Sequence, residues 1–339
     1  MALTTFITPF GRYCYRRLPM GINIGPEVFQ LKMQKMLQDL PGCAVIMDDI
    51  LVWGATLEVH NNNLKAVQRR IAEYGLTLNE DKGQIGAKEV KFFGHLLSAQ
   101  GLHPSPEKIE AITRMPPPKN VTELRSLCGM INYLSKFIDG LATAIKPMTD
   151  LLKSGVVFMW GQPQQLAFET VKDMVTRLPS LKYFDVKRDI VISADASSYG
   201  LGGVLLQKTE AGLSPIAFAS RALNEAEQRY SQIERECLAA TWACERFRKY
   251  IVGLPEFELW TDHKPLVPLI DRKPLDQVPL RCQRLLIRLL QFNPIVSHKP
   301  GKQLVIADAL SRNPATGQES ESRACESLAS EIAVDVECR

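Results

Sequence analysis

The 339-residue sequence has no feature that would span a membrane, direct secretion or build a disulfide framework. No apolar run approaches the roughly 18 residues of a membrane-spanning helix, and the N-terminus lacks the basic and then apolar layout of a signal peptide. The eight cysteines form no CxxC pair and no Cys/His cluster with zinc spacing. These absences predict an intracellular, cytoplasmic protein with reduced thiols and no membrane partner.

A strong charge of one sign is also missing, since 41 basic and 37 acidic residues give a net charge of +4. Residues 314–339 hold six acidic and two basic residues, so the part of the chain before them is more basic than this total. A modest basic excess is compatible with a phosphate-bearing partner but does not require one. The acidic last segment has few aromatic residues and is typical of a disordered tail.

The first third of the chain mixes strand and helix patterns. Its β-rich hairpin, CAVIMDDILVWG, contains Asp48 and Asp49, and two adjacent acids inside an apolar run suggest a cation or a shared proton. A hairpin tip in water explains the same pair. The expected strands are 6–17, 76–82 and 90–97, and the expected helices begin at Pro26 and at Glu58.

The remainder predicts helices and then a sheet. Three helices are expected at 121–137, 145–153 and 163–177, after the prolines at 116–118. From residue 189 the order is a hairpin (189–206), a strand (215–220), a long helix (226–250), a strand (257–260), a helix (283–290), a strand (294–298) and a short final helix. The fold class is therefore α/β and α+β multidomain, ending in a five-stranded mixed sheet with flanking helices.

The strands and helices of this last region each offer one acid. Asp195 follows the first strand, Glu236 lies on the apolar face of the long helix, Asp262 follows the fourth strand, and Asp308 lies on the final helix. Taken alone, Asp195 is more typical of a turn than of a catalyst. Four converging carboxylates would repel one another without divalent cations, so the set predicts a hydrolytic site with two Mg²⁺ or Mn²⁺ ions.

Four segments carry a family resemblance: ISADASSYGLGGVLLQ, YSQIERECLAATWA, FELWTDHKPL and HKPGKQLVIADALSR. In order and spacing they resemble the ribonuclease H domain of gypsy-type LTR retrotransposon polyproteins. The resemblance implies that the four acids bind metal and cut the RNA strand of an RNA/DNA hybrid. It also implies that His298 assists product release, although an ordinary surface histidine explains that residue nearly as well. Because glycines have no side chain, those at 200, 202 and 203 would let the hybrid backbone approach the ions closely.

The first half resembles the reverse transcriptase of the same family. TPFGRYCYRRLPMGINIGPEVFQ is similar to the segment that contacts template and nucleotide, IMDDI to the polymerase signature, LTLNEDKG to the lysine motif, and VKFFGHLLS to the primer grip. TELRSLCGMINYLSKFI resembles the thumb and connection. The resemblance implies that Asp48 is a metal-binding palm acid, with Asp49 as its neighbour.

Template-primer and hybrid contacts are also expected. One helix face carries Arg281, Arg284 and Arg288. These arginines could contact nucleic acid, or they could simply form a basic stripe exposed to solvent. The candidate nucleic-acid-binding residues are Arg12, Arg17, Gln30, Lys82, Gly94, His95, Arg281, Arg284 and Lys299.

The resemblance further implies a partial palm at 1–110, thumb and connection helices at 111–180, a ribonuclease H domain at 181–313 and the tail at 314–339. Family polymerases need a third palm aspartate upstream of residue 1, so the polymerase site is expected to be incomplete and primer extension absent. Two alternatives stay open: a non-catalytic nucleic-acid-binding remnant, or part of a full-length reverse transcriptase. In an intact element, an integrase would follow the tail and the protein would lie in a virus-like particle.

Overall fold

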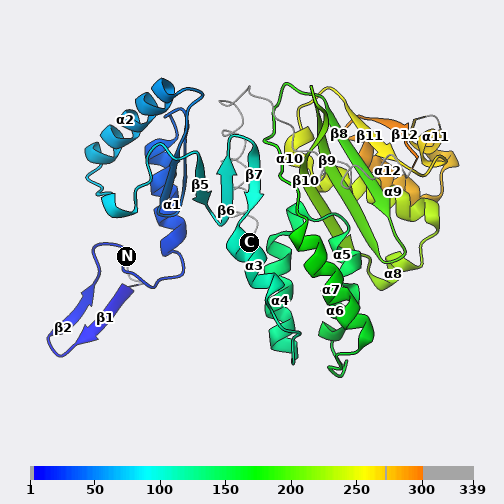
Figure 1. The fold of residues 1–339 in the computed structure, drawn as a ribbon, viewed down its shortest axis with the longest axis horizontal. Helices are drawn as coiled ribbons and strands as arrows, with labels where there is room; N and C mark the ends of the chain where they lie inside the picture. The colour runs from blue at the N-terminus through cyan, green and yellow to red at the C-terminus, as the bar shows by residue number, and fades with distance from the viewer. Residues whose placement is uncertain (1–3, 272, 301–339) are drawn as a thin grey trace. The chain divides into compact units, whose positions relative to one another are not determined.

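The computed structural model describes residues 4–271 and 273–300, which form two compact units that divide after Ala87 (Figure 1). No helix in this described part of the chain is long and apolar enough to cross a membrane. The expected final helix with Asp308 and the expected acidic tail lie outside the described residues.

The first unit consists of two hairpins and two helices. Its elements are β1 (Thr5–Thr8), β2 (Gly11–Cys14), α1 (Gly25–Leu37), β3 (Cys43–Ile46), β4 (Asp49–Val52) and α2 (Leu57–Glu73). Its core brings together Met33, Met36, Leu37, Val45, Val67 and Ile71. The strand predicted at 6–17 is instead the β1–β2 hairpin, because Gly11 has a φ of 127° at the turn. The strand predicted at 76–82 is absent from this unit, and a 3-10 turn occupies Glu80–Lys82.

The second unit begins with a three-stranded antiparallel sheet and a group of helices. The strands are β5 (Glu89–Phe92), β6 (His95–Ser98) and β7 (Gly101–Pro104). The helices are α3 (Pro106–Thr113), α4 (Val121–Tyr133), α5 (Leu141–Ala144), α6 (Lys146–Thr149) and α7 (Gln162–Thr176). The helices predicted at 121–137 and 145–153 are both shorter than expected, since each ends in a 3-10 turn.

A five-stranded mixed sheet forms the rest of this unit, as predicted (Figure 1). Its order is β10 (Gly212–Ala222), β9 (Gly200–Thr209), β8 (Ile190–Ala196), β11 (Phe257–Thr261) and β12 (Pro294–His298). The first three strands are antiparallel hairpin neighbours, whereas β8, β11 and β12 run parallel. The carboxyl ends of β8 and β11 therefore lie at the same edge of the sheet.

Helices connect and cover these strands. They are α8 (Glu225–Gln228), α9 (Gln232–Arg246), α10 (Arg248–Ile251), α11 (Leu266–Asp271) and α12 (Leu280–Leu290). The single helix predicted at 226–250 is broken, because Ser231 donates its backbone N–H to Glu234 Oε2 at 2.9 Å and so caps a new helix. α9 packs closely on β9, where a Cβ on Gly203 would lie 3.2 Å from Ala243 Cβ.

Candidate active site

The two central parallel strands bring two of the predicted acids together. Asp195 is the last residue but one of β8, and Asp262 directly follows β11. In the register of these strands, Trp260 pairs with Ser193, so the two acids come at corresponding positions further along. Both side chains are solvent-exposed.

Glu236 completes a group of three carboxylates. It lies on α9, which packs on β8, and its side chain is 2% exposed. One carboxylate oxygen from each of the three acids lies within 4.8 Å of those of the other two. The prediction that Glu236 faces inward is confirmed by its burial.

Two of the three acids, Glu236 and Asp195, have raised pKa values. Burial raises the pKa of Glu236 to about 8, and the charges of Asp195 and Asp262 add to this effect. Asp195 remains accessible to solvent, but the protein atoms around its carboxyl partly desolvate it and raise its pKa, with the charge of Asp262 as the second cause. Glu236 therefore carries a proton for most of the time at neutral pH when no cation is present.

These residues fit a divalent cation. Glu236 Oε1 accepts a hydrogen bond from Gln232 Nε2 at 2.5 Å, while the buried Oε2 has no hydrogen-bond partner in the described part of the chain. An unpartnered buried oxygen next to two exposed carboxylates is unfavourable by itself. Three hard oxygen donors, two of them on exposed side chains, match the ligands that Mg²⁺ and Mn²⁺ prefer.

A further acid near the site, Asp139, did not follow from the sequence. It lies between Phe137 and α5, and its Oδ1 is 4.0 Å from where a Cβ on Gly202 would stand. Gly202 pairs with Asp195 across the β8–β9 ladder. Burial raises the pKa of Asp139, and the nearby charge of Asp195 contributes. A separation of 56 residues from Asp195 gives no local pattern, so only the packing of α5 on the sheet reveals this neighbour.

The glycines of this hairpin serve mainly to pack protein against protein. A Cβ on Gly200 would lie 2.8 Å from Thr143 Oγ1, and Gly203 faces α9 as described above. At Gly202, by contrast, the nearest atom would be 4.0 Å away. The interpretation that these glycines admit a hybrid backbone is therefore wrong for Gly200 and Gly203, and for Gly202 it stays a prediction.

Two residues at the end of β12 also lie beside the acids. His298 Nε2 is 3.1 Å from the backbone oxygen of Asp262, and the histidine side chain is exposed. Lys299 donates its backbone N–H to Thr261 at 2.9 Å, and its Nζ lies 5.0 Å from the centre of the Trp260 ring. The predicted position of His298 near the site thus agrees with the structure, whereas Asp308 lies outside the described residues.

In the first unit, Asp48 and Asp49 occupy the exposed tip of the β3–β4 hairpin. The preceding Met47 has a φ of 53°. Gln30, expected to bind nucleic acid, spans this turn, accepting from Met47 N at 2.5 Å and donating to Val45 O at 2.9 Å. No third acid joins Asp48 and Asp49 in the kind of group found in the second unit, within the residues that the structure describes.

The expected primer-grip residues lie on the β5–β6 turn. Gly94 has a φ of 75°, and a Cβ there would lie 2.2 Å from Tyr133 Oη. The His95 ring is 4% exposed and stacks on the Tyr133 ring at 5.0 Å. Burial lowers the pKa of His95 to about 3, and the charges of two lysines assist. The His95 ring thus packs inside the protein, and the expectation that His95 binds nucleic acid stays a prediction.

The basic residues expected to bind nucleic acid differ in whether they form ion pairs within the protein. On α12, Arg281 pairs with Glu234 at 2.7 Å and Arg288 with Glu245 at 2.6 Å, so both tie α12 to α9. Arg284 is exposed and forms no ion pair with the described residues. The remaining exposed candidates, all in the first unit, are Arg12, Arg17 and Lys82.

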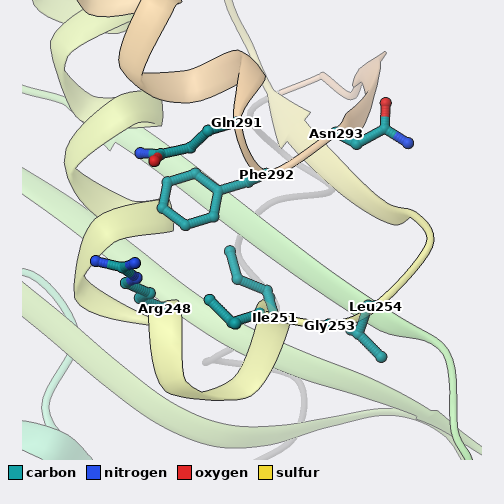
Figure 2. Close-up of a pocket in the computed structure, with 8 residues that line it drawn as sticks. Arg248, Ile251, Gly253, Leu254, Gln291, Phe292 and Asn293 are labelled. Atoms are coloured by element: carbon teal, nitrogen blue, oxygen red, sulfur yellow. The ribbon is translucent and has the colours of Figure 1, made fainter.

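A separate hollow of about 220 Å³ lies at the ends of α10 and α12. Figure 2 shows the Phe292 ring and Gln291 on one side of it, with Arg248 and Ile251 on the other. None of the three carboxylates lines this hollow. The three carboxylates are therefore separate from this hollow.

Comparison with known proteins identifies both regions. The family described as reverse transcriptase (RNA-dependent DNA polymerase) matches residues 2–97, and the RNase H-like domain found in reverse transcriptase matches residues 160–259. The Pol polyprotein from transposon 297 of Drosophila melanogaster is 36% identical over 91% of this chain and 29% of its own length. The transposon Tf2-7 polyprotein of Schizosaccharomyces pombe is 32% identical over 91% of this chain and 23% of its own length.

A solved structure supports the same fold. The foamy viral protease-reverse transcriptase in complex with an RNA/DNA hybrid has a TM-score of 0.74 and 22% identity, over 94% of this chain and 43% of that one.

The Pol polyprotein from transposon gypsy of Drosophila melanogaster is 30% identical over 91% of this chain and 30% of its own length. The chain thus spans about a quarter to a third of the relatives it matches. It belongs to the family of gypsy-type retrotransposon Pol polyproteins, of which it carries reverse transcriptase and RNase H-like regions.

Proposed function

We propose that the second unit cleaves the RNA strand of RNA/DNA hybrids in a reaction that requires Mg²⁺ or Mn²⁺, with two ions in the site. The observation that carries this proposal is the buried Glu236 Oε2, unpartnered beside Asp195 and Asp262, in a region that matches an RNase H-like family. The similar foamy viral protein was solved with an RNA/DNA hybrid, which supports a hybrid as the ligand.

The acids would act together as ligands of the cations. Asp195, Glu236 and Asp262 would hold the cations, together with Asp308 as the expected fourth ligand. When bound, the ions would activate a water molecule and stabilise the leaving oxygen of the phosphodiester. Glu236, with a pKa near 8, keeps a proton without cation and must release it to become a ligand. The exposed Asp195 and Asp262 leave the site open to a phosphate from solvent.

The experiment is cleavage of a hybrid labelled on its RNA strand by the 339-residue chain with Mg²⁺. Asp195→Asn should slow cleavage about 100-fold or more, equivalent to about 2.7 kcal/mol of activation free energy. Asp189→Asn is the matched control and should cleave normally, because this side chain is 76% exposed and has only a 3.4 Å contact with Lys208. Absence of cleavage, or cleavage that survives Asp195→Asn, would contradict the proposal.

A non-catalytic role would give a different pattern. A nucleic-acid-binding remnant would hold the hybrid with a steep salt dependence and without turnover. Such binding by the wild-type chain, with uncut RNA at saturating Mg²⁺, would favour that alternative.

For the first unit we propose that the 339-residue chain does not extend a primer. The exposed Asp48 and Asp49 form no group of three acids with other described residues, and two carboxylates on one tip hold two ions poorly. Incorporation of deoxynucleotides by the purified chain on a template-primer would contradict this proposal.

A further inference from the structure

The first turn of α9 carries a hydrogen-bonded bridge to the active site. Gln232 Nε2 donates to Glu236 Oε1 at 2.5 Å, and Arg235 Nη2 donates to Gln232 Oε1 at 2.7 Å. Arg235 Nη1 donates to the backbone oxygen of Ser197 at 3.3 Å. Because Ser197 directly follows β8, the bridge links the strand end that carries Asp195 to the helix that carries Glu236.

The bridge determines how the Gln232 amide faces. A guanidinium group only donates hydrogen bonds, and an ionised carboxylate only accepts them. Gln232 must therefore present its oxygen to Arg235 and its NH₂ group to Glu236. This arrangement occupies Oε1 of Glu236 and leaves the buried Oε2 without a partner.

We propose that Gln232 and Arg235 act as one positioning unit that orients the Glu236 carboxylate so that Oε2 is free to bind the active-site cation. This proposal rests on the proposed metal-dependent function. The Gln232 amide donates to Glu236 Oε1, and the positively charged Arg235 guanidinium lies behind that amide. Both side chains thus stabilise the ionised carboxylate that a cation requires.

The probe is Mn²⁺, titrated into the full 339-residue chain by isothermal titration calorimetry at pH 7.5. Gln232→Leu should weaken Mn²⁺ binding about 10-fold, the lower end of the effects seen when residues that orient a metal ligand are replaced. Gln232 is exposed, so its replacement leaves the core intact. Binding of Mn²⁺ to other carboxylates is subtracted with the Asp195→Asn variant.

The matched control is Gln228→Leu, the same chemical change at the end of α8. Its amide donates to the backbone oxygen of Leu223 at 3.0 Å and does not touch the acids. This variant should bind Mn²⁺ as the wild type does. The unfolding temperature without metal, measured for every variant, separates a loss of folding from a loss of ligand orientation.

A second variant tests whether the two residues act together. Arg235→Met should also weaken Mn²⁺ binding about 10-fold, and the double variant should be no weaker than the weaker single variant, since both changes break one bridge. Unchanged Mn²⁺ affinity in Gln232→Leu, or losses that multiply in the double variant, would overturn the positioning unit.

The outcomes also distinguish this inference from the function on which it rests. If the wild type binds no Mn²⁺ beyond the Asp195→Asn baseline, both are overturned. If the wild type binds Mn²⁺ and Gln232→Leu weakens that binding while no hybrid is cut, the positioning unit is supported and the nuclease function fails.

Discussion

Replacing Glu236 by glutamine should stabilise the protein when no divalent cation is present. The pKa of Glu236 lies at about 8 in the folded protein, against an ordinary value of 4.5, chiefly because of burial. Between these values the folded chain binds one proton more than the unfolded chain, so the stability falls as the pH rises. The loss is about 1.4 kcal/mol for each pH unit and reaches at most about 5 kcal/mol above pH 8.

The sign of this effect can be measured directly. Urea unfolding in EDTA gives the Glu236 contribution as the stability of the wild type minus that of Glu236→Gln, and this difference should be greatest below pH 4.5 and fall up to about pH 8. Glu236→Gln should show a flatter profile and exceed the wild type at pH 8. A Trp53→Phe background restricts tryptophan fluorescence to the second unit, because the other tryptophans are Trp160, Trp242 and Trp260.

Glu234→Gln, two residues earlier on the same helix, is the matched contrast. Burial raises the pKa of Glu234, but hydrogen bonds from Ser231 and the Arg281 ion pair outweigh it, and the net direction is downward. Its loss should therefore destabilise the protein at neutral pH and matter less in acid. Added Mg²⁺ should stabilise the wild type at pH 8 more than Glu236→Gln. A difference between the wild type and Glu236→Gln that is flat or rises from pH 5 to pH 8 would refute the reasoning.

Three further predictions concern packing and charge around the site. Gly203→Ala should lower stability by about 1–3 kcal/mol, because its Cβ would meet α9 at 3.2 Å, whereas Gly202→Ala should unfold at the wild-type urea concentration. Asp139→Asn should raise the metal-free unfolding midpoint at pH 8 and leave it unchanged at pH 3, since burial and a nearby charge raise the pKa of that carboxyl. Arg288→Ala, which loses the pair with Glu245, should lower stability by at most about 1 kcal/mol, less in 1 M salt.

The order of the elements in the second unit was largely predictable from the sequence. The strand at 294–298 is predicted with the bounds it has in the structure, and the ends of β8 and β11 carry the two acids that the pattern singles out. The sequence also contains a signal for the break of the long helix. Ser231 is followed three positions later by Glu234, and this spacing is that of a capping box. Without that signal, continuous apolar periodicity favours one helix.

Contacts between distant segments could not be predicted. The sequence does not show that Asp139 approaches Gly202, that Tyr133 covers His95, or that two of the three arginines on α12 are paired with α9. Each of these contacts depends on how helices pack, and periodicity indicates only which side of a helix is apolar. Glu236 was predictable because its own helix face is apolar, whereas the bridge through Gln232 depends on side-chain geometry.

The parallel pairing of β8 with β11 also determines when during folding the acids meet. The β8–β9–β10 hairpins join residues that are close in the sequence, but Asp195 and Asp262 are 67 residues apart, with α9 between them. Such long-range pairing forms after local hairpins and helices. A partly folded or nascent chain therefore presents isolated carboxylates, which hold divalent cations weakly. On the proposed nuclease function, the chain would therefore cleave no RNA until the centre of its sheet has formed.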